Sequence, residues 1–140
     1  MTELTAEATT RLPLAGRSLL RTALKLDAAV TGANAAAYLA AAEPLSDLFG
    51  LPVAQLRATG AFLALFAAAV WLVGTRDAIP RGAVRAVIAA NAGWVLLSAV
   101  AAAAGWGSPE TAGTVWIALQ AAAVGGLAEL QVAGLPREPR

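Results

Sequence analysis

The 140-residue sequence contains no cysteine and no histidine, and its single methionine is Met1. Disulfides, thiol nucleophiles, zinc–thiolate sites and imidazole chemistry are therefore excluded for these residues. The usual axial ligands of haem are also missing apart from Met1. We therefore expect no cofactor and no metal.

Charged residues are scarce as well. They make up 14% of the sequence, whereas hydrophobic residues make up 59%. A soluble domain averages about 25% charged and under about 50% apolar residues, because it must cover its surface with polar groups. The apolar excess indicates that lipid surrounds most of this chain. The net charge of +1, without a basic patch interleaved with aromatic residues, predicts no nucleic-acid partner.

Four apolar segments are long enough, or nearly so, to cross the hydrocarbon core, which needs about 20 residues in a helix. Only a helix satisfies all backbone polar groups within one such segment, and the alternating pattern of barrel strands is absent. The sequence therefore predicts an all-α, integral membrane, antiparallel bundle of four transmembrane helices. We expect these helices at about residues 24–42, 57–75, 84–104 and 111–130.

One membrane domain is expected over residues 17–132. Residues 1–16 are rich in Thr, Glu and Ala and show no periodic apolar face, so we expect a disordered cytoplasmic tail there. Residues 133–140 are expected to form a second cytoplasmic tail. Prolines and glycines separate the apolar segments, with Pro44 after the first and Pro80 between the second and third.

Lysine and arginine are distributed very unevenly between the two ends of this predicted bundle. On the side that carries both termini and the loop after the second helix there are nine, and on the opposite side Arg57 stands alone. Because cytoplasmic loops carry the excess of Lys and Arg, the sequence predicts a multi-pass protein of the bacterial cytoplasmic (inner) membrane with both termini cytoplasmic. The nine are Arg11, Arg17, Arg21, Lys25, Arg76, Arg81, Arg85, Arg137 and Arg140.

The first apolar segment has an alternative interpretation. Basic residues, an apolar stretch and Ala40-Ala41-Ala42 before Glu43 resemble a cleavable signal peptide. However, the stretch contains Asp27 and Asn34, it is weakly hydrophobic, and the leader before it is long. Cleavage would leave three helices with the N-terminus outside.

A polar stripe follows the first helix. Asp27, Thr31, Asn34 and Tyr38 are spaced at i, i+4, i+7 and i+11, so they share one narrow face. Such a stripe cannot face lipid cheaply and should face the bundle or a partner. Either it forms interhelical hydrogen bonds, which is the interpretation we favour, or it forms a polar path or small binding site. Natural partners on the later helices are Asn91, Ser98, Trp116, Gln120 and Gln131.

Asn34 and Asn91 should lie at similar depth, so we expect them to share an amide cluster near mid-membrane. Asp27 and Glu129 are carboxylates near the inner ends of apolar segments, and Arg85 is an available counter-ion. Ion pairs among these three residues would anchor the helices at the inner boundary. The alternative is a proton-coupled or cation-binding site.

No catalytic motif occurs: there is no nucleophile–base pair, no phosphate-binding glycine loop and no metal-ligand spacing. We therefore expect a non-enzymatic membrane protein that acts by helix packing. It would self-associate as a homo-oligomer or serve as an accessory subunit of another membrane protein, with the lipid bilayer as its other partner. Two alternatives stay open: a small transporter or channel that uses the polar stripe, and a binder of lipid or another hydrophobic ligand.

The run LDAAVTGANAAAYLAAAEPLSDLFGLP, followed by LRATGAFLALFAAAVWLVGTR and later by TAGTVWIALQ, resembles small four-helix integral membrane proteins that are common in actinobacteria. The resemblance covers about residues 18–135 and implies the same four-helix membrane fold. That family has no established activity, so the resemblance implies no functional residues.

Overall fold

The computed structural model describes residues 2–106 and 109–135, and these residues form five helices and no strand. The all-α class is therefore confirmed for this part of the chain. Three of the described helices, α3, α4 and α5, are long and apolar enough to cross a membrane. In chain order the helices are α1 (Thr2–Ala40), α2 (Ala42–Phe49), α3 (Val53–Thr75), α4 (Arg81–Ala104) and α5 (Thr111–Gly134).

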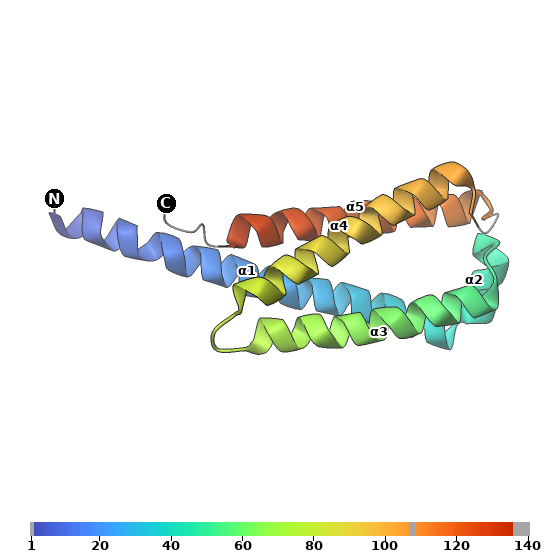
Figure 1. The fold of residues 1–140 in the computed structure, drawn as a ribbon, viewed down its shortest axis with the longest axis horizontal. Coiled ribbons are helices and arrows are strands. Elements are labelled where there is room, and N and C mark those ends of the chain that lie inside the picture. The colour runs from blue at the N-terminus through green and yellow to red at the C-terminus, as the bar shows by residue number, and fades with distance from the viewer. Residues whose placement is uncertain (1, 107–108, 136–140) are drawn as a thin grey trace.

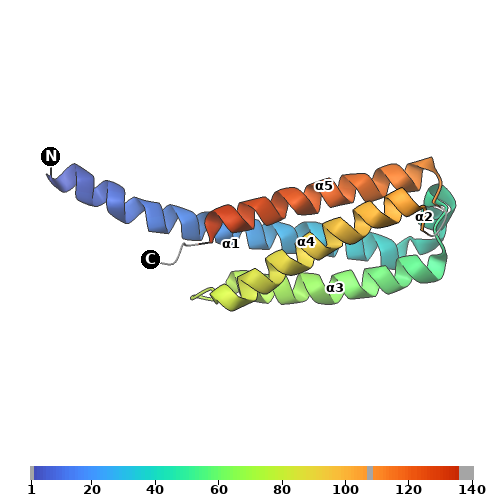
Figure 2. The same ribbon diagram turned by 45° about the horizontal axis from the view of Figure 1, so that its top comes forward.

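The four long helices form one elongated bundle (Figure 1). α1 packs against both α3 and α5, and α5 packs against α4, so the order around the bundle is α3, α1, α5, α4. The loop between α3 and α4 lies at the same end as the end of α5, and α2 lies at the other end (Figures 1 and 2). α3 and α4 contact each other little, and this leaves the bundle open along one side.

Of the four long helices in the described part of the chain, α1 is the one that is not among these candidate membrane spans. Its polar residues Asp27 and Thr31 are buried, together with the apolar Leu24, Ala35 and Tyr38. Because α1 packs between α3 and α5, these polar groups are kept away from the surroundings of the bundle, and a lower hydropathy is tolerated. Cleavage near residue 42 would remove this central helix and leave α3 and α5 without their common neighbour.

α1 begins at Thr2 and therefore includes residues 2–16, for which the composition predicts a disordered tail. This part of the helix extends past the end of the bundle (Figures 1 and 2). Ala, Leu and Glu are good helix formers, and extending an existing helix needs no new nucleation. At the other terminus α5 continues to Gly134, and most of the tail expected at 133–140 lies outside the described residues.

Helix α2 closes one end of the bundle. It ends at Phe49 and is capped by Gly50, whose φ of 67° is a left-handed conformation that glycine adopts without strain. The carbonyl of Phe49 accepts a 2.9 Å hydrogen bond from the backbone N–H of Glu110. The Phe49 ring stacks on Trp116 with 5.5 Å between ring centroids. A Cβ on Gly113 would collide with the Phe49 carbonyl, so only glycine permits this approach of α5.

At the opposite end, Arg21 of α1 holds the C-terminus of α3. Its Nη1 donates 2.8 Å hydrogen bonds to the carbonyls of Gly74 and Arg76, and its Nη2 donates one of 3.3 Å to the carbonyl of Asp77. The last carbonyls of a helix have no partner within the helix. A cation there also interacts favourably with the helix dipole. This arginine therefore fixes α1 relative to α3.

Candidate functional site

The polar stripe of α1 meets polar residues of α4 and α5 at two levels of the bundle, and a third contact lies nearer α2. The level nearest the α3–α4 loop contains Asp27, Thr31, Asn91 and Gln131, all of them buried. Asn91 Nδ2 and Gln131 Nε2 each donate a 2.7 Å hydrogen bond to Asp27 Oδ2. Thr31 donates a 3.1 Å bond to Asp27 Oδ1. We call these four residues the Asp27 cluster.

The Asp27 cluster joins three helices through one carboxylate. Its donors are two amides and a hydroxyl, so the carboxylate is satisfied by uncharged groups. The ion pairs expected among Asp27, Arg85 and Glu129 are not needed for this, and both Arg85 and Glu129 lie exposed on their helices. An ion pair among the described residues is found at the other end of the bundle, between Arg57 and Glu43 with 3.5 Å between Nη2 and Oε1.

Two further contacts continue along α1 toward α2. Asn34 donates a hydrogen bond from Nδ2 to Oε1 of Gln120 on α5. Trp116 Nε1, also on α5, donates a 2.8 Å hydrogen bond to the hydroxyl of Tyr38. Each of the four stripe residues therefore has a described hydrogen-bond partner, and α5 supplies a partner at every level.

The pairing differs in one respect from the expected amide cluster. Asn34 and Asn91 do not share hydrogen-bond partners: Asn34 bonds to Gln120, whereas Asn91 bonds to Asp27 and, at 3.3 Å, to Gln131. The reason is geometric, because α1 packs directly on α5 and leaves α4 to reach α1 at the Asp27 level. Ser98 is buried on α4, and among the described residues no hydrogen bond joins it to the stripe.

The open side of the bundle contains a pocket of about 500 Å³. α3 and α4 diverge from their connecting loop toward the α2 end (Figures 1 and 2), and the pocket lies between them with α1 and α5 behind. We call it the lateral pocket. Its lining residues are Val30, Thr31, Asn34, Ala58, Thr59, Phe62, Leu63, Phe66, Ala90, Asn91, Gly93, Trp94, Leu97, Gln120 and Val124.

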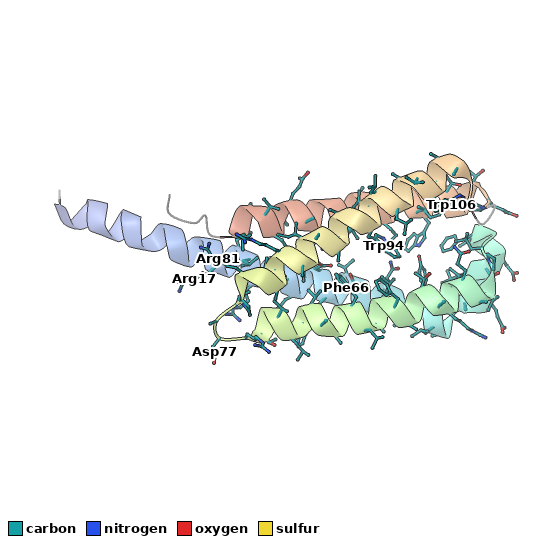
Figure 3. The ribbon with its side chains drawn as sticks, in the orientation of Figure 1. Arg17, Phe66, Asp77, Arg81, Trp94 and Trp106 are labelled. Atoms are coloured by element: carbon teal, nitrogen blue, oxygen red, sulfur yellow. The ribbon has the colours of Figure 1, made fainter. Side chains whose placement is uncertain are left out.

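The lateral pocket has apolar walls and a polar floor. Aromatic rings of α3 and α4 form part of the walls, and Figure 3 shows Phe66 and Trp94 in the space between these helices. Phe62 lies nearly parallel to both rings, at 14° and 11°, with centroids 6.3 Å apart in each pair. The floor contains the amide pair of Asn34 and Gln120. No charged residue is among the described residues that line the pocket.

The floor retains hydrogen-bonding capacity. The bond between Asn34 and Gln120 uses one amide N–H and one carbonyl oxygen. A carboxamide carries two N–H donors and an acceptor oxygen, so the Asn34 oxygen and the Gln120 amino group can each bond to a further partner. In chemical terms, the pocket suits an apolar body that carries one or more uncharged polar groups.

Thr31, Asn34, Asn91 and Gln120 are among the site residues predicted from the sequence, and the structure brings these four to one pocket. The aromatic wall of the pocket was not predicted. Phe62 and Phe66 are spaced at i, i+4 on α3 and so share a face, which is a signal in the sequence. That signal could not indicate a pocket, because an aromatic pair at this spacing fits a lipid-facing or core position equally well.

Comparisons with protein-family models, with curated proteins and with solved structures found no match to this chain. The resemblance to small actinobacterial four-helix membrane proteins therefore stays a prediction from the sequence. Among the described residues, no group of three or more acidic side chains is placed to hold a metal ion. What the site does is accordingly inferred from its own geometry.

Proposed function

We propose that this chain is a non-enzymatic membrane protein that binds a neutral, lipid-like molecule in the lateral pocket. One observation carries the proposal: the pocket of about 500 Å³ is lined by apolar and aromatic residues, it has amides at its floor, and no described lining residue is charged. Ligand pockets are typically about 300–1,000 Å³, mostly apolar, with a few placed polar groups.

Because no described lining residue is charged, we expect the ligand to be uncharged as well. A charged group moved from water into such surroundings without a partner is strongly disfavoured. An uncharged hydroxyl, carbonyl or amide can instead bond to Asn34 or Gln120. Without such a ligand, the remaining hydrogen-bonding groups of these two amides would face acyl chains and have no partner. The ligand we infer is therefore a neutral amphiphile whose polar group lies deep in the bilayer.

The size of the pocket favours a small molecule over a helix of another protein. A helix with its side chains is about 10–12 Å wide, so one turn of about 5.4 Å fills roughly 400–600 Å³. The pocket therefore holds the volume of about one turn, far less than a spanning helix. The exposed lining residues Phe62 and Leu97, 55% and 52% accessible, are at the mouth, so a ligand can enter sideways from the membrane.

The membrane placement is part of the same proposal. α1, α3, α4 and α5 would cross the bacterial cytoplasmic membrane, with both termini in the cytoplasm. This is supported by the nine-to-one distribution of Lys and Arg in the sequence. It is also supported by Lys25, whose amino group lies 5.7 Å from the centroid of the Trp71 ring, a contact that suits an interfacial depth.

Filling the pocket tests the proposal. Ala90 and Ala89 are neighbours on α4, both exposed, and Ala90 alone of the two lines the pocket. Purified wild-type protein should retain close to one neutral lipid per chain in native mass spectrometry. Ala90→Phe should reduce this at least about ten-fold, because the ring would occupy the site. Ala89→Phe should retain it.

A photoactivatable probe makes the test independent of what survives purification. A diazirine-bearing fatty alcohol added to membranes should form adducts with peptides that contain Phe62 or Trp94, and Ala90→Phe should suppress them. The proposal fails if adducts are spread evenly over the lipid-facing surface, or if Ala89→Phe and Ala90→Phe behave alike in both measurements.

Helix packing as a self-associating or accessory subunit is our second candidate function. It is supported by the exposed small residues Ala118 and Ala122 on α5, which leave a shallow surface where another helix backbone can approach. Cysteine cross-linking through Ala118→Cys in membranes would give dimers under this candidate and none under a strictly monomeric ligand binder. Transport through the stripe receives less support, because Asp27 and Tyr38 are hydrogen-bonded within the bundle and are not among the described residues that line the pocket.

A further inference from the structure

A second pocket, of about 300 Å³, lies at the end of the bundle away from α2. It lies between α1, the loop that joins α3 to α4, and the residue after α5, Leu135. Arg17, Arg21 and Arg81 line it, and Asp77 is the one acidic residue among the described lining residues. Figure 3 shows Arg17 and Arg81 at this end of the bundle, with Asp77 on the bend of the loop between α3 and α4. We call it the basic pocket.

Arg21 gives the basic pocket a fixed positive charge. Its guanidinium is held by three backbone carbonyls at the end of α3, so its position is set by the packing of α1 on α3. Carbonyl oxygens are uncharged, so these bonds orient the cation without neutralising it. Arg17 and Arg81 add two further guanidinium groups to the lining, and Asp77 is the acidic residue beside them.

The rest of the basic pocket is apolar. Leu20 is 3% exposed and lies within the hydrophobic core of this end, and Ile79 and Leu135 pack against the same core. A site that pairs cations with aliphatic side chains matches a molecule whose phosphate is followed directly by hydrocarbon. A small soluble anion would use only the cationic part.

We propose that the basic pocket binds the phosphate group of an anionic phospholipid from the cytoplasmic leaflet. Guanidinium groups bind phosphate through paired, charge-assisted hydrogen bonds. Basic pockets between helices on the cytoplasmic side are suited to anionic headgroups. The lipid lies here with its phosphate among Arg17, Arg21 and Arg81 and its first methylenes against Leu20 and Ile79. This site depends on the proposed membrane orientation but not on the lateral pocket.

The experiment measures lipid binding to the purified full chain by native mass spectrometry. Phosphatidylglycerol and phosphatidylcholine with identical acyl chains are titrated in parallel. We expect tighter binding of phosphatidylglycerol, weakened about five-fold by Arg17→Gln and about five-fold by Arg81→Gln. The matched control is Arg76→Gln, which removes the same charge at the same end of the bundle, and Arg76 is not among the lining residues. We expect this control to stay within about two-fold of wild type, as for a screened surface charge.

Each outcome decides the proposal. Equal weakening by Arg76→Gln and Arg17→Gln would mean general surface attraction and overturns a defined site. Saturable binding of inorganic phosphate that displaces the lipid would assign the pocket to a soluble anion and overturns the lipid. If Arg81→Gln melts early, Arg17→Gln alone carries the test, because Arg17 is exposed and holds no described structural contact.

Discussion

Gln131 donates a 2.7 Å hydrogen bond to the carboxylate of Asp27, although 104 residues separate them in the chain and both side chains are fully buried. This bond ties the last turn of α5 to the middle of α1. Asn91 of α4 donates to the same carboxylate oxygen. The relative positions of three helices therefore depend on one acidic side chain.

Replacing Gln131 should destabilise the bundle substantially. Gln131→Leu removes a hydrogen bond to a carboxylate and leaves Asp27 buried, and such bonds contribute about 1.5–3 kcal/mol. The free energy of unfolding in mixed detergent micelles should fall by that amount.

A double-mutant cycle isolates this pair. In an Asn91→Leu background, which removes the amide that bonds to both residues, Asp27→Leu combined with Gln131→Leu should be less destabilised than the sum of the single variants, because each single variant leaves the other residue of the pair buried without this bond. Strict additivity would mean that the two residues do not interact.

Gly134 allows α5 to touch α1, and its replacement should be costly. A Cβ at Gly134 would lie 2.7 Å from the backbone N and 2.9 Å from the Cα of Leu20, atoms that cannot move away by rotating a side chain. Gly134→Ala should therefore lower stability by about 1–3 kcal/mol through overpacking. Gly126 lies on the same helix and has no such neighbour within 4 Å, so Gly126→Ala should raise stability by up to about 1 kcal/mol. Similar melting temperatures for both variants would contradict this packing.

Loss of Arg21 should weaken the contact between α1 and α3. Arg21→Gln removes three hydrogen bonds to the C-terminus of α3, of which two are exposed to solvent, and we expect a loss of about 1–2 kcal/mol. Arg17→Gln removes the same charge one turn earlier from an exposed position and should change stability by less than about 0.5 kcal/mol. The two variants are compared by thermal unfolding in the same detergent. An equal loss of stability in both would show that the effect comes from the lost charge and not from the hydrogen bonds of Arg21.

Single cysteines test the orientation cleanly, because the natural sequence has none. Asp47→Cys on α2 should react with a membrane-impermeant maleimide in intact cells. Ser18→Cys and Ala78→Cys should react only after the membrane is opened. All three residues are exposed, so access depends on the side of the membrane. Labelling of Ser18→Cys in intact cells would show that α1 does not cross as proposed, and its loss from the mature chain would indicate cleavage.

Several features followed from local sequence. The segments expected at 57–75, 84–104 and 111–130 all lie within α3, α4 and α5, because apolar runs and their bounding prolines and glycines act over a few residues. The stripe from Asp27 to Tyr38 followed from helix periodicity alone. Gln120 and Gln131 were predicted as its partners because they share one face of the last apolar segment with Trp116.

The tertiary structure alone decided which partners meet and where the bundle stays open. Asn91 reaches Asp27 rather than Asn34, and α3 and α4 diverge to leave the lateral pocket. Both depend on how closely whole helices approach. Gly60 lets α3 come so near α1 that a Cβ there would lie 3.0 Å from side-chain atoms of Leu39 and Tyr38. Such approaches depend on the shapes of two helix surfaces together. The residue types along the chain determine each surface, but they do not determine which two surfaces pack against each other.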